Sequence, residues 1–385
     1  MLISSTISSI LEERQCLPRG RWFSLVPRCF FIVYEPMLWK DLSMEEMLKV
    51  ALDAMGGDNA PDAVIAGAVQ ALEKKSNIKI YLVGPEDLLK EKCAAYTYDK
   101  TRMEIVHASE VITCEEAPVS AIRKKKDSSI VVALQLVKNG QADAFVSAGS
   151  TGAVLVGAQL IVGRMRGVRR PPLGVLIPTT KGVSVLVDNG ANVDARPDHL
   201  LQFARLGSVY YEHAMGVKNP RVALVNIGVE EEKGNALVKE TYPLLKECPD
   251  INFTGYVEAR EIPHGGADVI VCEGFTGNVI LKLYEGVGGA LISEVKKGMM
   301  STLRSKIGAL LVKPALKQTL KRFDASEYGG APMLGLNGLV VKTHGSSNAK
   351  EICNSVIQCF TFKEQNIQEK FKKLYEQPEA SKTEE

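Results

Sequence analysis

Two segments of the chain repeat one arrangement that suits anion binding. Residues 142–154 and 267–279 each run from a short apolar stretch into a glycine, one further residue, Thr-Gly and then a helical pattern. Backbone N–H groups at a helix N-terminus favour a negatively charged ligand. A threonine cap and a glycine turn explain one such copy equally well, but two copies favour a shared anion site. The candidate residues of the two copies are Gly149, Ser150, Thr151 and Gly152, and Gly274, Thr276, Gly277 and Asn278.

Four further polar, glycine-bearing loops each follow a strand-like run. They cover residues 53–61, 188–194, 226–235 and 342–347. Ligands of open α/β sheets bind at the carboxyl ends of the strands, so in one parallel sheet several of these loops would share an edge and form a site. Their carboxylates could orient lysine and amide partners, or they could cap helices. The candidate phosphate or substrate contacts in these loops are Asp53, Gly56, Gly57, Asp58, Asp188 and Asn192.

The elements that would position these loops alternate along the chain from Leu48 onward. Near-continuous apolar runs are typical of strands buried on both faces. They predict strands at 49–53, 78–83, 103–106, 144–146, 184–188, 221–225 and 268–271. Helical spacing predicts helices at 62–73, 129–138, 197–213 and 234–246. Such alternation implies right-handed crossovers and a mostly parallel sheet, which defines an α/β fold.

The composition of the 385 residues excludes several classes of protein. Apolar residues make up 45% and charged residues 24%, as in an ordinary globular chain with a sizeable core. A net charge of +2 argues against a nucleic-acid binder, and no apolar run is long enough to span a bilayer. The eight cysteines are scattered, which favours reduced thiols in the cytoplasm over a metal site or disulfides. Neither a Walker loop nor a GxGxxG motif after a strand occurs.

The two ends differ from the rest of the chain. Residues 1–46 hold both tryptophans and several prolines without a clear period. A targeting peptide is one interpretation, but acidic residues near the start and a short apolar stretch are wrong for it. We therefore favour an upstream start, with Met44 or Met47 as the working initiator, so that residues 1–46 are an extension outside the fold. We expect one domain over residues 47–374 and a polar tail at 375–385.

Residues 295–322 combine basic and apolar side chains without any acidic residue. We expect Pro314 to split this stretch into two helical pieces. The pattern suits an anionic membrane surface, where each basic residue contributes about 1 kcal/mol. A helical hairpin that packs against its dimer mate, with the lysines in water, is the alternative, and both can hold. The expected membrane contacts are Leu303, Ile307, Leu310 and Leu311.

Seven short motifs together resemble those of one enzyme family. They occupy residues 51–58, 147–152, 189–194, 233–235, 273–278, 328–331 and 344–347. Over residues 48–374 the chain is similar to the bacterial acyl-acyl-carrier-protein:phosphate acyltransferases, which act early in phospholipid synthesis. The resemblance implies a homodimer with a Rossmann-like, three-layer α/β/α fold, related in plan to phosphotransacetylases and isopropylmalate dehydrogenases. It also implies acyl-carrier protein and inorganic phosphate as substrates, and a membrane glycerol-3-phosphate acyltransferase downstream. We expect no cofactor and no metal.

The chain departs from the pattern of this family at three positions. Asn59, Ser150 and Val229 stand where family members usually have His, Asn and Thr. None of these three family residues can therefore be indispensable here if activity is retained.

The implied reaction needs a phosphate oxygen in line with a thioester carbonyl, and phosphate itself is the nucleophile. Positioning of this kind can supply about 7–11 kcal/mol of the barrier. Backbone amides at the two glycine corners, including that of Asn278, could hold phosphate or stabilise the oxyanion. Lys233 is the preferred cation because the family motif has a lysine there, although it could be a solvated residue after three glutamates. His344 could relay a proton to the leaving thiolate, donate to phosphate or be structural.

Two basic runs, residues 123–126 and 164–170, could steer the acidic carrier protein towards the enzyme. One alternative function is a phosphotransacetylase-like enzyme that uses acyl-coenzyme A at the same phosphate site. Another is a non-catalytic membrane-bound scaffold for lipid-synthesis enzymes, which rests on residues 295–322. A dehydrogenase is suggested only by kinship of fold. We expect a cytoplasmic enzyme that associates peripherally with the membrane and binds no nucleic acid.

Overall fold

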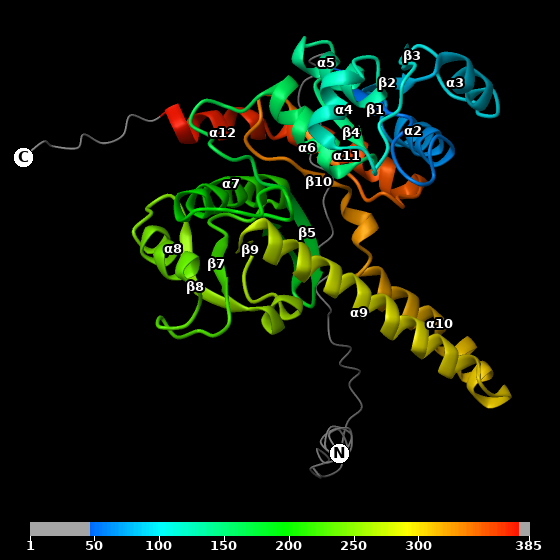
Figure 1. The fold of residues 1–385 in the computed structure, drawn as a ribbon. Coiled ribbons are helices and arrows are strands. Elements are labelled where there is room, and N and C mark those ends of the chain that lie inside the picture. Colours follow the sequence, from blue (N-terminus) through cyan, green and yellow to red (C-terminus); the bar gives the residue numbers. More distant parts are fainter. Residues whose placement is uncertain (1–46, 377–385) are drawn as a thin grey trace, which may run out of the picture. The chain divides into compact units, whose positions relative to one another are not determined.

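A computed structural model describes residues 47–376, which contain two β-sheets (Figure 1). The predicted extension at residues 1–46 and most of the predicted tail lie outside the described residues. The first sheet has the order β10-β11-β4-β1-β2-β3 and is parallel except for β10 at its edge. Its strands are β1 (Leu48–Asp53), β2 (Ile78–Gly84), β3 (Met103–His107), β4 (Ala144–Ser147), β10 (Ala331–Pro332) and β11 (Leu339–Lys342).

The second sheet follows the same plan as the first. Its strands are β5 (Gly174–Thr179), β6 (Gly182–Val187), β7 (Arg221–Asn226), β8 (Asn252–Glu258) and β9 (Val269–Val271). The order is β5-β6-β9-β7-β8, with only β5 antiparallel. The two repeated segments lie on β4 and β9, the third strand of each sheet. The α/β prediction is confirmed, but the strands form two sheets instead of one, because local patterns do not specify which strands pair.

Helices cover both faces of each sheet. They are α2 (Asp62–Lys74), α3 (Glu86–Cys93), α4 (Pro118–Lys124), α5 (Ser129–Lys138), α6 (Thr151–Gly157), α7 (Pro197–Met215), α8 (Ala236–Lys246), α9 (Gly274–Met300), α10 (Leu303–Lys321), α11 (Ala349–Glu364) and α12 (Ile367–Glu376). On β1, Val50 packs in the cluster that contains α2 and α11, and Ala51 in the cluster that contains α4, α5 and α6. On β9, Val269 packs with α7, and Ile270 with α9. Burial on both faces explains why the strands are almost continuously apolar.

One hydrophobic cluster runs through both sheets. It includes Val146 of β4 and Val187 of β6. A backbone link joins the two halves as well, because Leu334 N–H donates to Pro172 O at 2.9 Å. The carboxyl ends of both sets of strands are therefore held within one packed unit.

The stretch of basic and apolar residues belongs to a protruding hairpin of α9 and α10 (Figure 1). We expected a break at Pro314, but Pro314 lies inside α10. The chain turns earlier because Thr302 and Ser305 form a capping box, with N–H to hydroxyl distances of 2.9 and 3.1 Å. A proline removes one backbone hydrogen bond without having to end an exposed helix.

The apolar runs in the sequence do not predict the two-residue β10, nor the longer strands β5 and β8. Pro178 lies in β5, and proline argues against a central strand, but β5 is an edge strand where proline is tolerated. Gly255 interrupts β8 with a φ of +97°, and the register with β7 shifts between Val222 and Leu224. Neither strand therefore has the uninterrupted apolar run that marks the central strands.

Candidate active site

The loops after β1, β4 and β11 interlock at the carboxyl edge of the first sheet. β4 lies between β1 and β11, with Ser147 in register with Lys342. Ser147 Oγ donates to Asp53 Oδ2 at 2.6 Å and accepts the N–H of Gly149 at 2.9 Å. Burial raises the pKa of Asp53, although its hydrogen bonds favour the carboxylate. Asp53, a predicted site residue, thus holds the β4 loop in position.

Two predicted glycines permit this close approach. A Cβ on Gly56 would lie 2.5 Å from Gly149 N. Gly57 has a φ of +98°, and a Cβ there would lie 2.7 Å from Gly345 O. Any side chain at either position would push the three loops apart. Asp58, the next residue, donates its N–H to Gly345 O at 2.8 Å.

The start of α6 leaves backbone donors available. Ser150 caps this helix by accepting the N–H of Ala153 at 3.4 Å. The amide of Gly149 is used by Ser147 Oγ. Among the described residues, the amides of Ser150, Thr151 and Gly152 have no protein acceptor. These three donors can bind the oxygens of an anion at the helix start.

A buried lysine that our sequence analysis did not select lies in this cluster. Lys342 ends β11 and is 7% exposed. Its ammonium donates to Thr343 O, and Asp53 and Asp58 interact with it electrostatically. Burial lowers the pKa of Lys342 to about 8, although nearby negative charges act in the opposite direction. The signal in the sequence was a lysine at the end of an apolar strand, directly before the His344 motif.

His344 is exposed in the loop after β11. Its Nδ1 accepts the N–H of Ser346 at 3.2 Å and lies 2.8 Å from Ser346 Oγ. A neutral ring with an accepting Nδ1 carries its proton on Nε2. Asn59 donates to Ser346 O and Ser347 O at 3.0 and 3.3 Å. Asn59 therefore ties the β1 loop to the His344 loop.

At the end of β6, Asp188 orients several donors around one carboxylate. It accepts the N–H groups of Leu173, Ala191 and Asn192 at 2.8, 3.3 and 2.6 Å, and the side-chain amide of Asn192 at 3.0 Å. Burial raises the pKa of Asp188, while these hydrogen bonds lower it. The buried Oδ1 atoms of Asn189 and Asn192 have no partner among the described residues. Asp188 thus has the orienting role, and the two asparagines keep acceptors for a ligand.

The second glycine corner differs from our expectation, because the amides of Gly274, Thr276 and Gly277 are already engaged. Gly274 N–H donates to Asn192 O at 2.8 Å, and Gly277 N–H to Glu273 O at 3.0 Å. Glu273 caps α9 by accepting the N–H of Thr276 at 3.1 Å and its hydroxyl at 2.5 Å. The carboxylate of Glu273 occupies the position that an anion would take. The two repeated segments therefore share a fold but not a set of open donors.

Helix α9 connects the two clusters of loops. A Cβ at Gly190 would lie 3.7 Å from Asn278 Cβ, so Asn278 lies beside the β6 loop. About two turns further along, partial burial raises the pKa of Glu285, and the charges of His344 and Glu351 act on this pKa in opposite directions. The helix that starts at the second corner therefore approaches the loop that carries His344.

Lys233 lies in the exposed loop after β7. Its ammonium is 2.9 Å from Glu230 Oε1, and this lysine lowers the pKa of Glu230. Asn226 Nδ2 donates to Lys233 O at 3.2 Å, which holds the loop against the end of β7. The side chain is thus at a strand end, as predicted, but it has a carboxylate partner.

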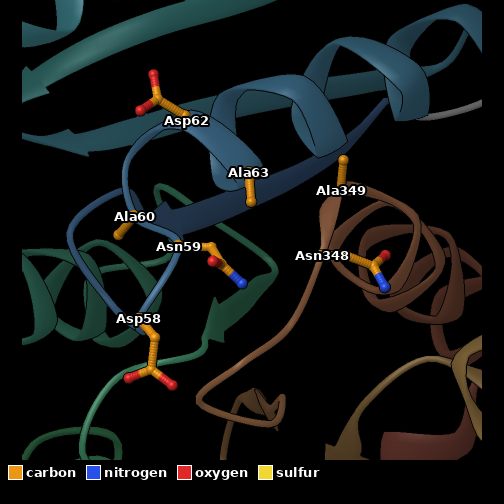
Figure 2. A pocket seen from close by; sticks show the side chains of 7 residues that line it. All are labelled: Asp58, Asn59, Ala60, Asp62, Ala63, Asn348 and Ala349. Carbon is orange, nitrogen blue, oxygen red and sulfur yellow. The ribbon is translucent and has the colours of Figure 1, made fainter.

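A polar pocket of about 540 Å³ lies next to the first cluster (Figure 2). It is formed where the loop into α2 meets the loop into α11 (Figure 2). Carboxylates and amides dominate its lining, which suits a hydrogen-bonding group better than a hydrocarbon chain. The lining residues are Asp58, Asn59, Ala60, Asp62, Ala63, Asn348 and Ala349.

Within residues 47–376, no group of three or more His, Cys, Asp or Glu side chains is placed to hold a metal ion. No helix in this part of the chain is both long and apolar enough to cross a membrane.

Comparison with known proteins identifies the family. Residues 48–370 match the family described as fatty acid synthesis protein. The chain belongs to this family. Among fatty acid synthesis proteins, it is 52% identical over 320 residues to a phosphate acyltransferase of Clostridium perfringens, covering 83% of this chain and 94% of the relative. It is also 52% identical over 322 residues to one of Alkaliphilus oremlandii, covering 84% and 96%. The resemblance seen in the sequence is confirmed, and the protein is an enzyme of the acyltransferase class.

Solved structures support the fold. A phosphotransacetylase from Streptococcus pyogenes has a TM-score of 0.55 at 18% identity, covering 82% of this chain and 94% of that protein. The phosphotransacetylase EutD from Staphylococcus aureus has a TM-score of 0.53 at 17% identity with the same coverage. At this identity the likeness concerns the fold alone, and it confirms the predicted kinship in plan with phosphotransacetylases.

Proposed function

We propose that this protein transfers a fatty acyl group from acyl-carrier protein to inorganic phosphate and releases acyl phosphate. The observation that carries the proposal is a set of donors at one sheet edge, the amides of Ser150, Thr151 and Gly152, in a chain whose relatives are named phosphate acyltransferase. Such donors can bind phosphate oxygens directly.

In the proposed reaction an oxygen of hydrogen phosphate attacks the thioester carbonyl. The new C–O bond forms first and the carbonyl oxygen becomes an oxyanion. Its collapse breaks the C–S bond, and the sulfur leaves with the electron pair. The proton lost by phosphate is the one that the thiol gains, so no other reactant is needed. Thiolates leave readily because a thiol pKa is near 8.5. Preorganised amides then serve to position phosphate and to stabilise the oxyanion. His344 Nε2–H is suited to relay the proton.

A basic surface beside this corner supports carrier protein as the donor. A Cβ on Gly152 would lie 2.5 Å from Pro118 Cγ, so α4 packs directly on the start of α6. Arg123 and Lys124 end α4 and are exposed. They could steer an acidic carrier protein so that its thioester arrives at the corner. In the second basic run, at residues 164–170, Arg169 is already paired with Asp198. Arg123 and Lys124 of α4 are therefore the better docking surface for an acidic partner.

The test is an assay of acyl phosphate with purified protein. Acyl-carrier protein and acyl-coenzyme A are offered separately, with and without orthophosphate, and acyl phosphate is trapped with hydroxylamine. We expect phosphate-dependent product from acyl-carrier protein. Product from acyl-coenzyme A alone would establish the phosphotransacetylase-like alternative, and no product from either donor would contradict both proposals.

The carrier surface is tested in the same assay with Arg123→Glu/Lys124→Glu. We expect a salt-sensitive rise in KM for acyl-carrier protein and unchanged phosphate KM. Lys138→Glu, on an exposed position at the end of α5, is the matched control. Equal effects of the two variants would argue against docking on α4.

We also propose a homodimer that contacts an anionic membrane surface through the hairpin, upstream of a membrane glycerol-3-phosphate acyltransferase. On α10, Leu303, Ile307, Leu310 and Leu311 are 57–77% exposed and occupy one helical face. No residue of α10 is buried. Large exposed apolar surfaces of this kind mark interaction sites.

A further inference from the structure

Lys342 is a buried amine at the carboxyl edge of the first sheet. It is the last residue of β11 and pairs in register with Ser147 of β4. Only 7% of the residue is exposed. Lysine is almost never buried unless it is paired, because removing an ammonium from water is costly. A buried lysine at a strand end that carries ligand-binding loops therefore needs an explanation.

The protein leaves the ammonium incompletely paired. An ammonium has three donors, and within residues 47–376 Nζ donates only to Thr343 O. Asp53 and Asp58 attract Lys342 electrostatically, yet no carboxylate in this part of the chain is within 4.0 Å of Nζ. The carboxylate of Asp53 is committed to Ser147 Oγ and to the amide of Met55. Two donors of Lys342 are thus available to a ligand.

Two hydroxyls of the same loop are also without partners. Thr343 Oγ1 and Ser347 Oγ are buried, and neither has a hydrogen-bond partner among the described residues. Thr343 and Ser347 are 4% and 3% exposed. Buried polar groups are nearly always satisfied in folded proteins. Hydroxyl and ammonium donors on one short loop fit a ligand rich in acceptor oxygens.

We propose that Lys342 is a catalytic residue that contacts the attacking phosphate, with its ammonium donating to a phosphate oxygen at the edge where α6 begins. This assignment rests on the proposed function, because phosphate is the acceptor there. The Thr343 backbone link to Ser147, an N–H to O distance of 2.9 Å, keeps Lys342 beside the β4 loop. Lys342 attracts the phosphate and keeps it oriented, while the bond changes occur between phosphate and thioester. Lys233, in the loop after β7 of the second sheet, remains a separate candidate.

The charge state of Lys342 agrees with this role. Burial lowers its pKa to about 8, so a bound dianion would favour the protonated form. The titratable groups that act on Lys342 are Asp53 of β1, Asp58 of the following loop and Cys114 of the loop before α4. As the pH rises through about 8, Lys342 in the empty site loses its proton and its positive charge. The affinity for phosphate should therefore fall.

The experiment measures orthophosphate binding to the full-length protein by titration calorimetry, together with phosphate and acyl-donor KM values. We expect Lys342→Met to weaken phosphate binding at least tenfold at pH 7, with the acyl-donor KM within twofold of wild type. Lys138→Met, an exposed lysine on α5, should change neither value. Lys342→Arg should retain part of the affinity. A folded Lys342→Met protein with phosphate affinity within twofold of wild type would refute the assignment.

A second measurement covers the case in which Lys342→Met does not fold. Phosphate itself titrates near neutral pH, so wild type is compared with Lys342→Arg between pH 7 and 9. We expect the affinity of wild type to fall more than that of the arginine variant; identical profiles would refute the assignment. If the Lys342 variants lose phosphate affinity as expected but the protein forms no acyl phosphate, the proposed function is wrong and the contact between Lys342 and phosphate stands. If the protein binds no phosphate, both are wrong.

Discussion

At the residue scale, variants of Lys233 and of its partner Glu230 test whether the Lys233 side chain binds phosphate. If Lys233 binds phosphate, Lys233→Ala should raise the phosphate KM roughly 10- to 100-fold, because a hydrogen bond to a charged group contributes about 1.5–3 kcal/mol. Glu230→Gln removes the competing carboxylate and should lower the phosphate KM or leave it unchanged. Steady-state kinetics with varied phosphate give both values.

The two variants also separate binding from loop anchoring. A salt bridge that merely holds the loop would be lost in either variant, and both would then affect the kinetics equally. Wild-type turnover of Lys233→Ala would remove Lys233 from the mechanism.

Lys342 makes a stability prediction that is independent of activity. The folded-state pKa of about 8 lies below the ordinary 10.5, so at neutral pH the folded protein holds a charge that it disfavours. Lys342→Met should raise the free energy of unfolding at pH 7 by on the order of 1–3 kcal/mol. Between pH 8 and 10.5 the unfolded chain binds a proton that the folded chain does not. Wild-type stability should therefore rise with pH across this window, and the variant should lose that rise.

Denaturant unfolding in phosphate-free buffer measures this effect, with Lys138→Met as the exposed control. A less stable Lys342→Met protein, with the same pH slope as wild type, would indicate that the lysine has a structural role.

At the element scale, the two repeated segments show how one local pattern can serve two purposes. Each places a strand before a glycine corner and a helix, as the sequence predicts. In the first copy a serine caps α6, and three amides stay open. In the second, Glu273 caps α9, and its carboxylate accepts the amide and the hydroxyl of Thr276. The difference depends on one residue next to the motif, because a carboxylate at the cap competes with an anionic ligand.

The exposed face of α10 carries the membrane prediction. Leu310→Glu should weaken binding to vesicles that contain anionic lipid at least tenfold, since it removes an apolar group that the membrane would bury and adds a repelled charge. Flotation at low salt measures the bound fraction. Thr319→Glu is the matched control, because Thr319 is exposed on another side of α10. Absence of wild-type binding at low salt would contradict the membrane proposal.

At the scale of the whole molecule, α9 presents an apolar stripe that suits a second copy. Val279, Leu283, Val287, Leu291 and Val295 recur every four residues and are 43–64% exposed. Residues four apart are neighbours on a helix surface, so these side chains form a continuous stripe that winds slowly around α9. A stripe this long is rarely left to solvent.

We expect Leu283→Asp/Leu291→Asp to shift the protein from dimer to monomer in sedimentation experiments. Ser293→Asp, which adds a charge at an exposed position of α9 outside the stripe, should leave the dimer intact. A wild-type monomer at micromolar concentration would rule out this interface.

Local sequence determined the α/β class, most strand and helix positions and the loops that could carry a site. The periodic spacing of apolar residues and the glycine-bearing turns depend only on residues that are neighbours in the chain. They can therefore be recognised in the sequence itself. The tertiary structure decided the rest: two sheets instead of one, a hairpin that turns at Thr302 instead of Pro314, and an amide of Gly149 that is already used. It also buried Lys342. Strand pairing, burial and hydrogen-bond partners depend on residues far apart in the chain, and these set the charge and the open donors of the site.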